Sequence, residues 1–198
     1  MAAIFKTIHW EVEQLVNGVT TGSIQLPDLQ RPFVWPATKV RDLFDSMYRG
    51  YPVGILMFWD VPADGGTRAI AAGAQLAANH QIVDGQQRLT SLYAAVERHQ
   101  ARDLAYRKKK IVIAFNPFSE RFEAWTPALA RSPQWIADIS TVFQNQLRAS
   151  KDFLKRLAAS GLKLDEEQEE RIQIVFMRLA QLKKYLFDVV HIEKDADT

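Results

Sequence analysis

The chain has 198 residues, of which 47% are hydrophobic and 24% are charged. These values are typical of a globular protein and exclude intrinsic disorder or a coiled coil as the main state. Cysteine is absent, which excludes disulfide scaffolds, thiolate metal sites and cysteine catalysis and agrees with a cytoplasmic location. With 25 basic and 23 acidic residues the net charge is +2, so the chain as a whole does not have the charge of a nucleic-acid-binding protein.

Apolar runs in the sequence are short. The longest, residues 52–59, has eight residues, whereas a membrane span needs roughly 20. The N-terminal residues lack the long apolar segment of a secretory signal. We therefore expect no membrane partner.

The first sixty residues predict short helices and strands in alternation. Residues 8–17 have apolar side chains at helical spacing and reach a stop at Gly18, and residues 24–27 alternate as a short strand. Residues 36–49 predict a helix with proline in its first turn and with one apolar face, formed by Val40, Leu43, Phe44 and Met47. The apolar run 53–59 predicts a strand buried on both faces.

The middle of the chain begins with residues 62–80, which are rich in Ala and Gly and predict a loop or weakly ordered insertion, either a mobile lid or an idle loop. The elements expected after it are a strand over 81–83, a helix over 89–99, a hairpin pairing 111–115 with 121–125, and a mainly helical stretch over 134–160.

The last third predicts a long helix and a final strand. Asp165 with Gln168 three residues later has the pattern of a capping box. The apolar stripe that follows could pack on its own domain or face a partner helix. Residues 187–192 predict a strand that needs a neighbour, and we expect the chain to be the N-terminal part of a longer protein.

One dense basic run occurs, and it consists of Arg107, Lys108, Lys109 and Lys110. Such a run is either a solvated loop end before a strand or a weak contact for nucleic acid.

Standard catalytic signatures are missing: the sequence has no GxxxxGK[ST], GxGxxG, HExxH or GxSxG pattern. The four histidines are far apart in the sequence and show no ligand spacing, so we expect no zinc site.

Two polar segments each place a Gln-Arg pair between a predicted strand and a predicted helix. The first contains Gln30 and Arg31. The second is the run Asp84, Gly85, Gln86, Gln87 and Arg88, followed by Thr90. A strand-to-helix turn presents backbone N–H groups at the positive end of a helix and is suited to an anion.

The side chains of these turns fit phosphate chemistry. Glycine allows close approach of a phosphate, arginines can grip phosphate oxygens, and glutamines can bind sugar, phosphate or water. Asp84 can hold a divalent cation or orient a water molecule. The structural alternative is an Asp-Gly turn in which Arg88 pairs with Asp84 only to fasten the loop.

The segments PDLQRPFVWP, YPVGILMFW and IVDGQQRLTSLYAAV, in this order and spacing over roughly residues 7–100, resemble the N-terminal domain of GmrSD-type restriction enzymes. These are modification-dependent (type IV) antiphage proteins, and the domain belongs to the ParB/sulfiredoxin-like superfamily. The resemblance implies an α+β fold, a small mixed sheet with flanking helices followed by a mainly helical region. We divide the chain into a nucleotide-binding core over 1–125 and a helical extension with a terminal strand over 126–198, truncated at its C-terminus.

The resemblance also implies a function. The family's domain binds and hydrolyses a nucleoside triphosphate (NTP) with Mg²⁺ and thereby regulates DNA cleavage by a separate C-terminal nuclease. Its DGQQR motif corresponds to residues 84–88 and its QR motif to residues 30–31. On this basis Asp84, Gln87 and Arg88 would be catalytic, with Asp84 as the Mg²⁺ ligand. The nucleotide-binding residues would be Gln30, Arg31, Gly85, Gln86 and Thr90.

The alternatives differ in class. The chain could be a non-catalytic, nucleotide-gated DNA-binding module that uses residues 107–110, or an assembly scaffold that forms a homo-oligomer through its C-terminal helix. No His-Asn-His nuclease pattern is present, so we expect no DNA cleavage by this chain itself. Sulfiredoxin chemistry is excluded because it requires a cysteine.

Overall fold

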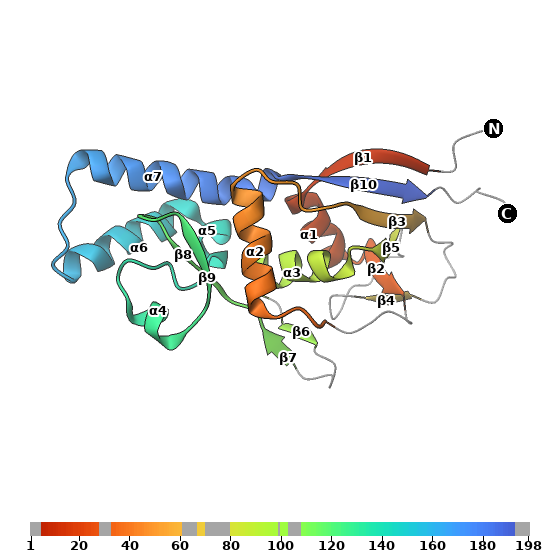
Figure 1. The fold of residues 1–198 in the computed structure, drawn as a ribbon, viewed down its shortest axis with the longest axis horizontal. Helices are drawn as coiled ribbons and strands as arrows, with labels where there is room; N and C mark the ends of the chain where they lie inside the picture. Colours follow the sequence, from red (N-terminus) through yellow and green to blue (C-terminus); the bar gives the residue numbers. More distant parts are fainter. Residues whose placement is uncertain are drawn as a thin grey trace.

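A mixed six-stranded sheet organises the computed structural model, in the order β1-β10-β3-β5-β2-β4 (Figure 1). The structure describes residues 5–27, 33–60, 67–69, 80–98, 100–102 and 108–192. The sheet strands are β1 (Phe5–Glu11), β2 (Ile24–Pro27), β3 (Leu56–Asp60), β4 (Thr67–Ala69), β5 (His80–Asp84) and β10 (Leu186–Ile192). Strand β10 is parallel to β3 and β2 is parallel to β5, while the other neighbours are antiparallel.

The helices follow the strands in chain order: α1 (Val12–Thr21), α2 (Ala37–Tyr48), α3 (Gln86–Val96), α4 (Pro127–Arg131), α5 (Ser140–Gln144), α6 (Gln146–Ala159) and α7 (Glu166–Ala180), with a 3-10 turn at Gln181–Lys184. Two further strand pairs are β6 (Gln100–Arg102) with β7 (Lys108–Lys110) and β8 (Ile113–Asn116) with β9 (Arg121–Ala124). The predicted α+β class, with a mixed sheet, flanking helices and a mainly helical C-terminal region, is confirmed.

The N-terminal segment corrects one prediction. Residues 8–11 belong to β1, and the first helix begins only at Val12 and continues through Gly18 to Thr21. Gly22 ends it in the left-handed conformation, with φ of 81°. The strand forms because the whole of β1 pairs with β10, about 180 residues away in the sequence, which local periodicity cannot reveal.

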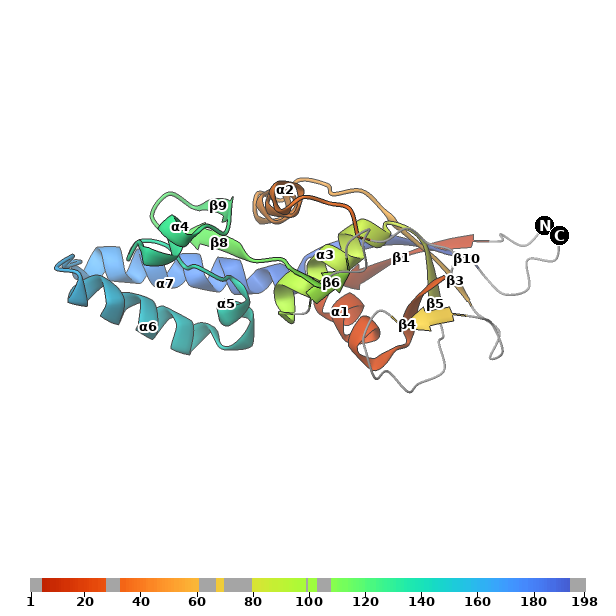
Figure 2. The same cartoon turned by 90° about the horizontal axis from the view of Figure 1, so that it is seen from below.

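Strand β3 also differs from its prediction. It begins at Leu56 rather than Val53, and only one of its faces is buried. Leu56 and Phe58 are buried, whereas Trp59 is exposed, as is Val83 on the neighbouring strand. Helices α1 and α3 lie on the covered side of the sheet, seen from below in Figure 2.

Helix α2 agrees with its predicted apolar face, and helix α3 is buried more completely. The side chains predicted to point inward from α2 are all buried, and α3 is buried along its length from Leu89 to Val96. Helix α3 begins at Gln86, three residues before its predicted start, so the helix N-terminus falls inside the DGQQR segment. This earlier start determines the geometry of the candidate site.

The C-terminal half forms the elongated end of the molecule at the left of Figure 1, where α6 and α7 pack together beside the β8–β9 hairpin. The predicted hairpin is confirmed. The predicted capping box is also confirmed, because Asp165 accepts from the Gln168 backbone N–H and the Gln168 side chain accepts from the Asp165 N–H. The stripe of α7 packs on its own chain through Ile172, Val175 and Leu179.

Strand β10 lies inside the sheet, second from its edge, between β1 and β3 (Figure 1). One hydrophobic cluster runs from Val12 through both halves of the chain to Val189. The division at residue 125 stays a prediction, and the terminal strand belongs structurally to the N-terminal sheet.

Of the predicted insertion 62–80, the structure describes only β4, which pairs with β2, and His80. The rest of that prediction lies outside the described residues. Among the residues that are described, no helix combines the length and the apolar character needed to cross a membrane.

Candidate functional site

The DGQQR segment forms the turn between β5 and α3. Asp84 ends β5, and Gly85 is the N-cap residue of α3 with φ of 89°, in the left-handed region. A side chain at Gly85 would be strained by this φ, and its Cβ would lie 2.3 Å from Cδ2 of Leu56. Glycine therefore lets the chain turn directly from the sheet into the helix, with the positive helix end close behind the turn.

The Arg88 side chain reaches across this turn and is held by a backbone carbonyl. Its Nη1 donates to the carbonyl oxygen of Val53 at 2.9 Å, and its Nη2 lies 3.5 Å from Oδ2 of Asp84. The guanidinium packs directly over Gly54, where a Cβ would come within 2.0 Å of Nη1. The Arg88 side chain is only 20% exposed, whereas that of Asp84 is 69% exposed.

The 3.5 Å contact is long for a charge-assisted hydrogen bond, so Asp84 is a loose partner for Arg88. The Val53 carbonyl is the firmer partner and fixes the guanidinium without neutralising it. The structural alternative of an Asp84–Arg88 pair that merely fastens the loop therefore explains only part of the geometry. An anion can take the guanidinium donors that these two contacts do not use.

Gln87 connects the two polar segments. Its Oε1 accepts from the backbone N–H of Val34 at 2.9 Å and of Trp35 at 3.3 Å. Phe33 next to them is buried, which anchors the same segment in the core. Residues 33–36, which follow the QR pair in the sequence, are thus attached to the first turn of α3.

The structure describes some of the remaining predicted site residues but not all of them. Gln86 is half-buried in the first turn of α3, and Thr90 is buried one turn later, with no hydrogen-bond partner for its hydroxyl among the described residues. Gln30 and Arg31 lie outside the described residues. The structure therefore assembles Asp84, Gly85 and the residues of the first helical turn, but does not place the QR pair.

The basic run forms part of a separate two-stranded ribbon. Lys108, Lys109 and Lys110 make up β7 and pair with β6, and Arg107 lies outside the described residues. The ribbon follows the C-terminal end of α3, the end opposite the DGQQR turn (Figure 1). Lys110 is exposed.

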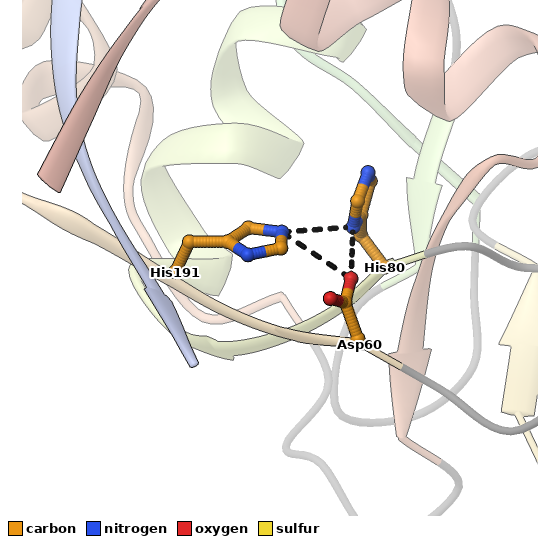
Figure 3. Close-up of side chains that lie close together, drawn as sticks. All are labelled: Asp60, His80 and His191. Atoms are coloured by element: carbon orange, nitrogen blue, oxygen red, sulfur yellow. Dashed lines mark hydrogen bonds and ion pairs between the residues drawn. The ribbon is translucent and has the colours of Figure 1, made fainter. Parts of the chain in front are cut away.

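A third polar group was missed by sequence reasoning. Two of the four histidines, His80 and His191, lie far apart in the sequence but meet Asp60 at the far end of the sheet (Figure 3), in a group that could hold a metal ion. The three ligand atoms are His80 Nδ1, His191 Nε2 and Asp60 Oδ1. Burial lowers the pKa of His80, and the neighbouring His191 lowers it further, whereas Asp60 opposes this shift in part.

The other two histidines do not join this group. His9 pairs with Asp188 on the exposed surface at 2.8 Å, and His99 lies outside the described residues. The only sequence signal for the group was that Asp60, His80 and His191 each stand at or next to a strand end, and the pairing of those strands was not predictable locally.

Comparison with known proteins gives two similarities. The family model described as "GmrSD restriction endonuclease, N-terminal domain" matches residues 12–198. An uncharacterized protein of Methanocaldococcus jannaschii, MJ0686, is 32% identical over 92 residues, which cover 41% of this chain and 16% of that protein. The chain thus spans only a small part of that relative's length.

Proposed function

Because the chain belongs to the family of GmrSD restriction endonuclease N-terminal domains, which are components of restriction enzymes, we propose that its β5–α3 turn binds a nucleoside triphosphate with Mg²⁺ and hydrolyses it. Hydrolysis would regulate DNA cleavage by a separate C-terminal nuclease domain or subunit. The observation that supports this most is Arg88, which is held by the Val53 carbonyl at a glycine turn at the start of a helix.

This arrangement suits a phosphate group for two reasons. The turn between a strand and a helix N-terminus presents backbone N–H groups and the positive end of the helix dipole. Arg88 adds a positive charge that is not fully paired and whose side chain is only 20% exposed, so its attraction for a phosphate is screened less than that of a surface arginine. In phosphoryl transfer such a group stabilises negative charge on the transferred phosphoryl oxygens.

Asp84 fits the role of Mg²⁺ ligand. Mg²⁺ takes oxygen ligands and is usually held by one or two carboxylates together with substrate phosphates and water. The Asp84 carboxylate is largely exposed at the same turn and is only loosely engaged by Arg88. When bound, the ion would neutralise charge on the phosphates. Asp84 would hold it and could orient the attacking water.

Gln86 and Gln87 would have different roles in the nucleotide site. Gln87 uses its Oε1 to fix residues 33–36 and thus acts by positioning the segment that follows Gln30 and Arg31. Gln86, one residue closer to the turn, is the better candidate to contact phosphate or water. Arg31 would supply a second positive charge, as the family motif implies. Thr90 is buried in α3, so it would support the nucleotide site by its packing within that helix rather than by direct contact with the nucleotide.

The test is a thermal-shift titration with ATP, GTP, CTP and UTP, with and without Mg²⁺, together with a phosphate-release assay. A ligand that binds only the folded state adds about 2.7 kcal/mol of stability at 100 times its Kd, and it therefore raises the melting temperature. We expect an Mg²⁺-dependent shift with at least one nucleotide. Asp84→Asn should lose Mg²⁺ dependence and phosphate release, and Arg88→Lys should lose most of the shift because lysine cannot make the same bidentate contact.

Arg49→Lys is the matched control, because Arg49 is exposed at the C-terminal end of α2 and pairs with Asp45 four residues before it. It should titrate like the wild type. If Asp84→Asn and Arg88→Lys fold and hydrolyse the nucleotide at the wild-type rate, the assignment of the site is wrong.

The β6–β7 ribbon supports a second candidate function, a non-catalytic DNA-binding module gated by nucleotide. Strand β7 consists of three lysines, of which Lys110 is exposed and could contact a phosphate. Binding of this kind weakens steeply with salt. Duplex DNA should then bind at low salt and be lost on Lys110→Glu, and absence of duplex binding at low salt would remove this candidate.

Other partners are proposed from the family and from α7. DNA would be engaged through the full-length protein, in the cytoplasm. Ile174 and Met177 are exposed on one side of α7, which favours a homo-oligomer through this helix. Sedimentation at two concentrations tests this, because a monomer at both would exclude it.

A further inference from the structure

Asp60, His80 and His191 converge because of strand register. Asp60 on β3 is directly opposite His80 on β5, and His191 on β10 is opposite Phe58, two residues before Asp60. Residues two apart on a strand point to the same face, so all three side chains rise from the same face of three adjacent strands. Figure 3 shows the two rings and the carboxylate directed toward one another.

The distances within this group match those of a metal site. His80 Nδ1 lies 3.0 Å from Asp60 Oδ1 and 3.1 Å from His191 Nε2, and His191 Nε2 lies 3.4 Å from Asp60 Oδ1. Tetrahedral zinc with nitrogen and oxygen ligands at about 2.0–2.1 Å separates its ligand atoms by about 3.3 Å. The three atoms therefore form a triangle of nearly the right size to be one face of a zinc tetrahedron.

Hydrogen bonds alone cannot make all three contacts between these atoms favourable at once. If both ring nitrogens carry hydrogen, both can donate to Asp60, but the two N–H groups then face each other across the 3.1 Å His–His contact. If only one carries hydrogen, the other nitrogen presents a lone pair toward a lone pair of its neighbour on at least one edge. A single cation between the three atoms would be attracted to all of them at once.

We propose that Asp60, His80 and His191 bind a divalent transition-metal ion, with zinc as the first candidate. Two imidazole nitrogens and one carboxylate suit zinc or another first-row metal and do not suit Mg²⁺, which prefers oxygen alone. His191 is buried, whereas His80 and Asp60 are partly exposed. The ion therefore has a path from solvent to these two residues, and no fourth ligand is found among the residues that the structure describes, which leaves that position for water or another ligand.

This site is separate from the proposed nucleotide site. His80 begins β5 and Asp84 ends it, which places the two sites about 13 Å apart along the strand. The metal would tie β3, β5 and β10 together at the end of the sheet away from the DGQQR turn. Its first effect would thus be on stability, and nucleotide binding with Mg²⁺ should persist when the metal ligands are changed.

The experiment uses the 198-residue chain without a histidine tag, stripped with EDTA and titrated with ZnCl₂ and CoCl₂. We expect one zinc per chain, a melting temperature raised by about 5–10 °C at 100 times the Kd, and visible d–d absorption of tetrahedral Co²⁺. Asp60→Asn and His191→Asn should weaken zinc binding by about 100-fold or more and abolish the cobalt absorption. His9→Asn is the matched control, because His9 also lies beside an aspartate but outside the group.

Melting in EDTA separates loss of a ligand from loss of the fold. Asp60→Asn keeps the size of the side chain and can still hydrogen-bond His80, so it should melt cooperatively without metal. The proposal is overturned if the wild type takes up less than one zinc per chain when zinc is supplied at 100 times the concentration of a weak competing chelator. It is also overturned if Asp60→Asn and His191→Asn bind zinc as tightly as His9→Asn.

Discussion

The position of the Arg88 guanidinium depends on Gly54, although Gly54 lies outside the DGQQR segment. It adopts φ of 85°, and a Cβ there would lie 2.0 Å from Nη1 of Arg88. Gly54→Ala should therefore displace the guanidinium from the Val53 carbonyl. We expect a loss of about 1–3 kcal/mol of stability from the strained φ and the broken contact, and loss of the nucleotide-dependent thermal shift.

Gly50 provides the control at the same scale. It has φ of 75°, but no atom lies within 4 Å of the position of its Cβ. Gly50→Ala should cost only the backbone strain, about 1–2 kcal/mol, and keep the nucleotide shift. Denaturant unfolding and nucleotide titration of both variants check this, and equal loss of nucleotide binding in the two would show that Arg88 is not the point of action.

At the scale of the element, a substitution at Asp165 shows how much the N-terminal cap stabilises α7. Asp165→Ala removes the oxygen that accepts from the Gln168 N–H at 2.8 Å, and we expect a loss of about 1 kcal/mol, or about 2–4 °C in melting temperature. Asp165→Asn retains an accepting oxygen and should stay close to wild type. A melting temperature for Asp165→Ala equal to that of Asp165→Asn would contradict a stabilising cap.

Elements whose signals are local were predictable from the sequence. The capping box of α7 and the apolar face of α2 depend on residues three or four positions apart, and both predictions are confirmed. The β5–α3 turn was predictable for the same reason, since Gly85 follows a short strand and precedes a helix. By contrast, β1 was mistaken for helix because its partner is β10, at the other end of the chain.

The candidate site divides in the same way. Sequence indicated which polar residues stand at the turn, but not that Gln87 would accept from the backbone of Val34 and Trp35, which are more than fifty positions away. It indicated nothing of the group formed by His80 and His191, since that depends on the order and register of β10, β3 and β5. Contacts between distant strands are set by the whole sheet, and no local pattern carries them.

At the scale of the whole molecule, β10 joins the two halves of the chain. It follows α7 and the 3-10 turn, yet it lies between β1 and β3 in the N-terminal sheet. Its inward-facing Phe187 and Val189 are fully buried in the common core. The helical region is therefore an excursion between strands of a single sheet rather than an appendage.

A chain ending at residue 185 should consequently fail to fold. Removing β10 leaves β1 without a neighbour and exposes one edge of β3. It also deletes Phe187 and Val189, each worth about 1.5–3 kcal/mol of burial, from a total stability of about 5–15 kcal/mol. Circular dichroism should show no cooperative melt, whereas a chain ending at residue 192, which retains every described strand, should melt cooperatively. A cooperative transition in the shorter chain would mean that the N-terminal strands form a stable unit by themselves and that β10 only docks onto it.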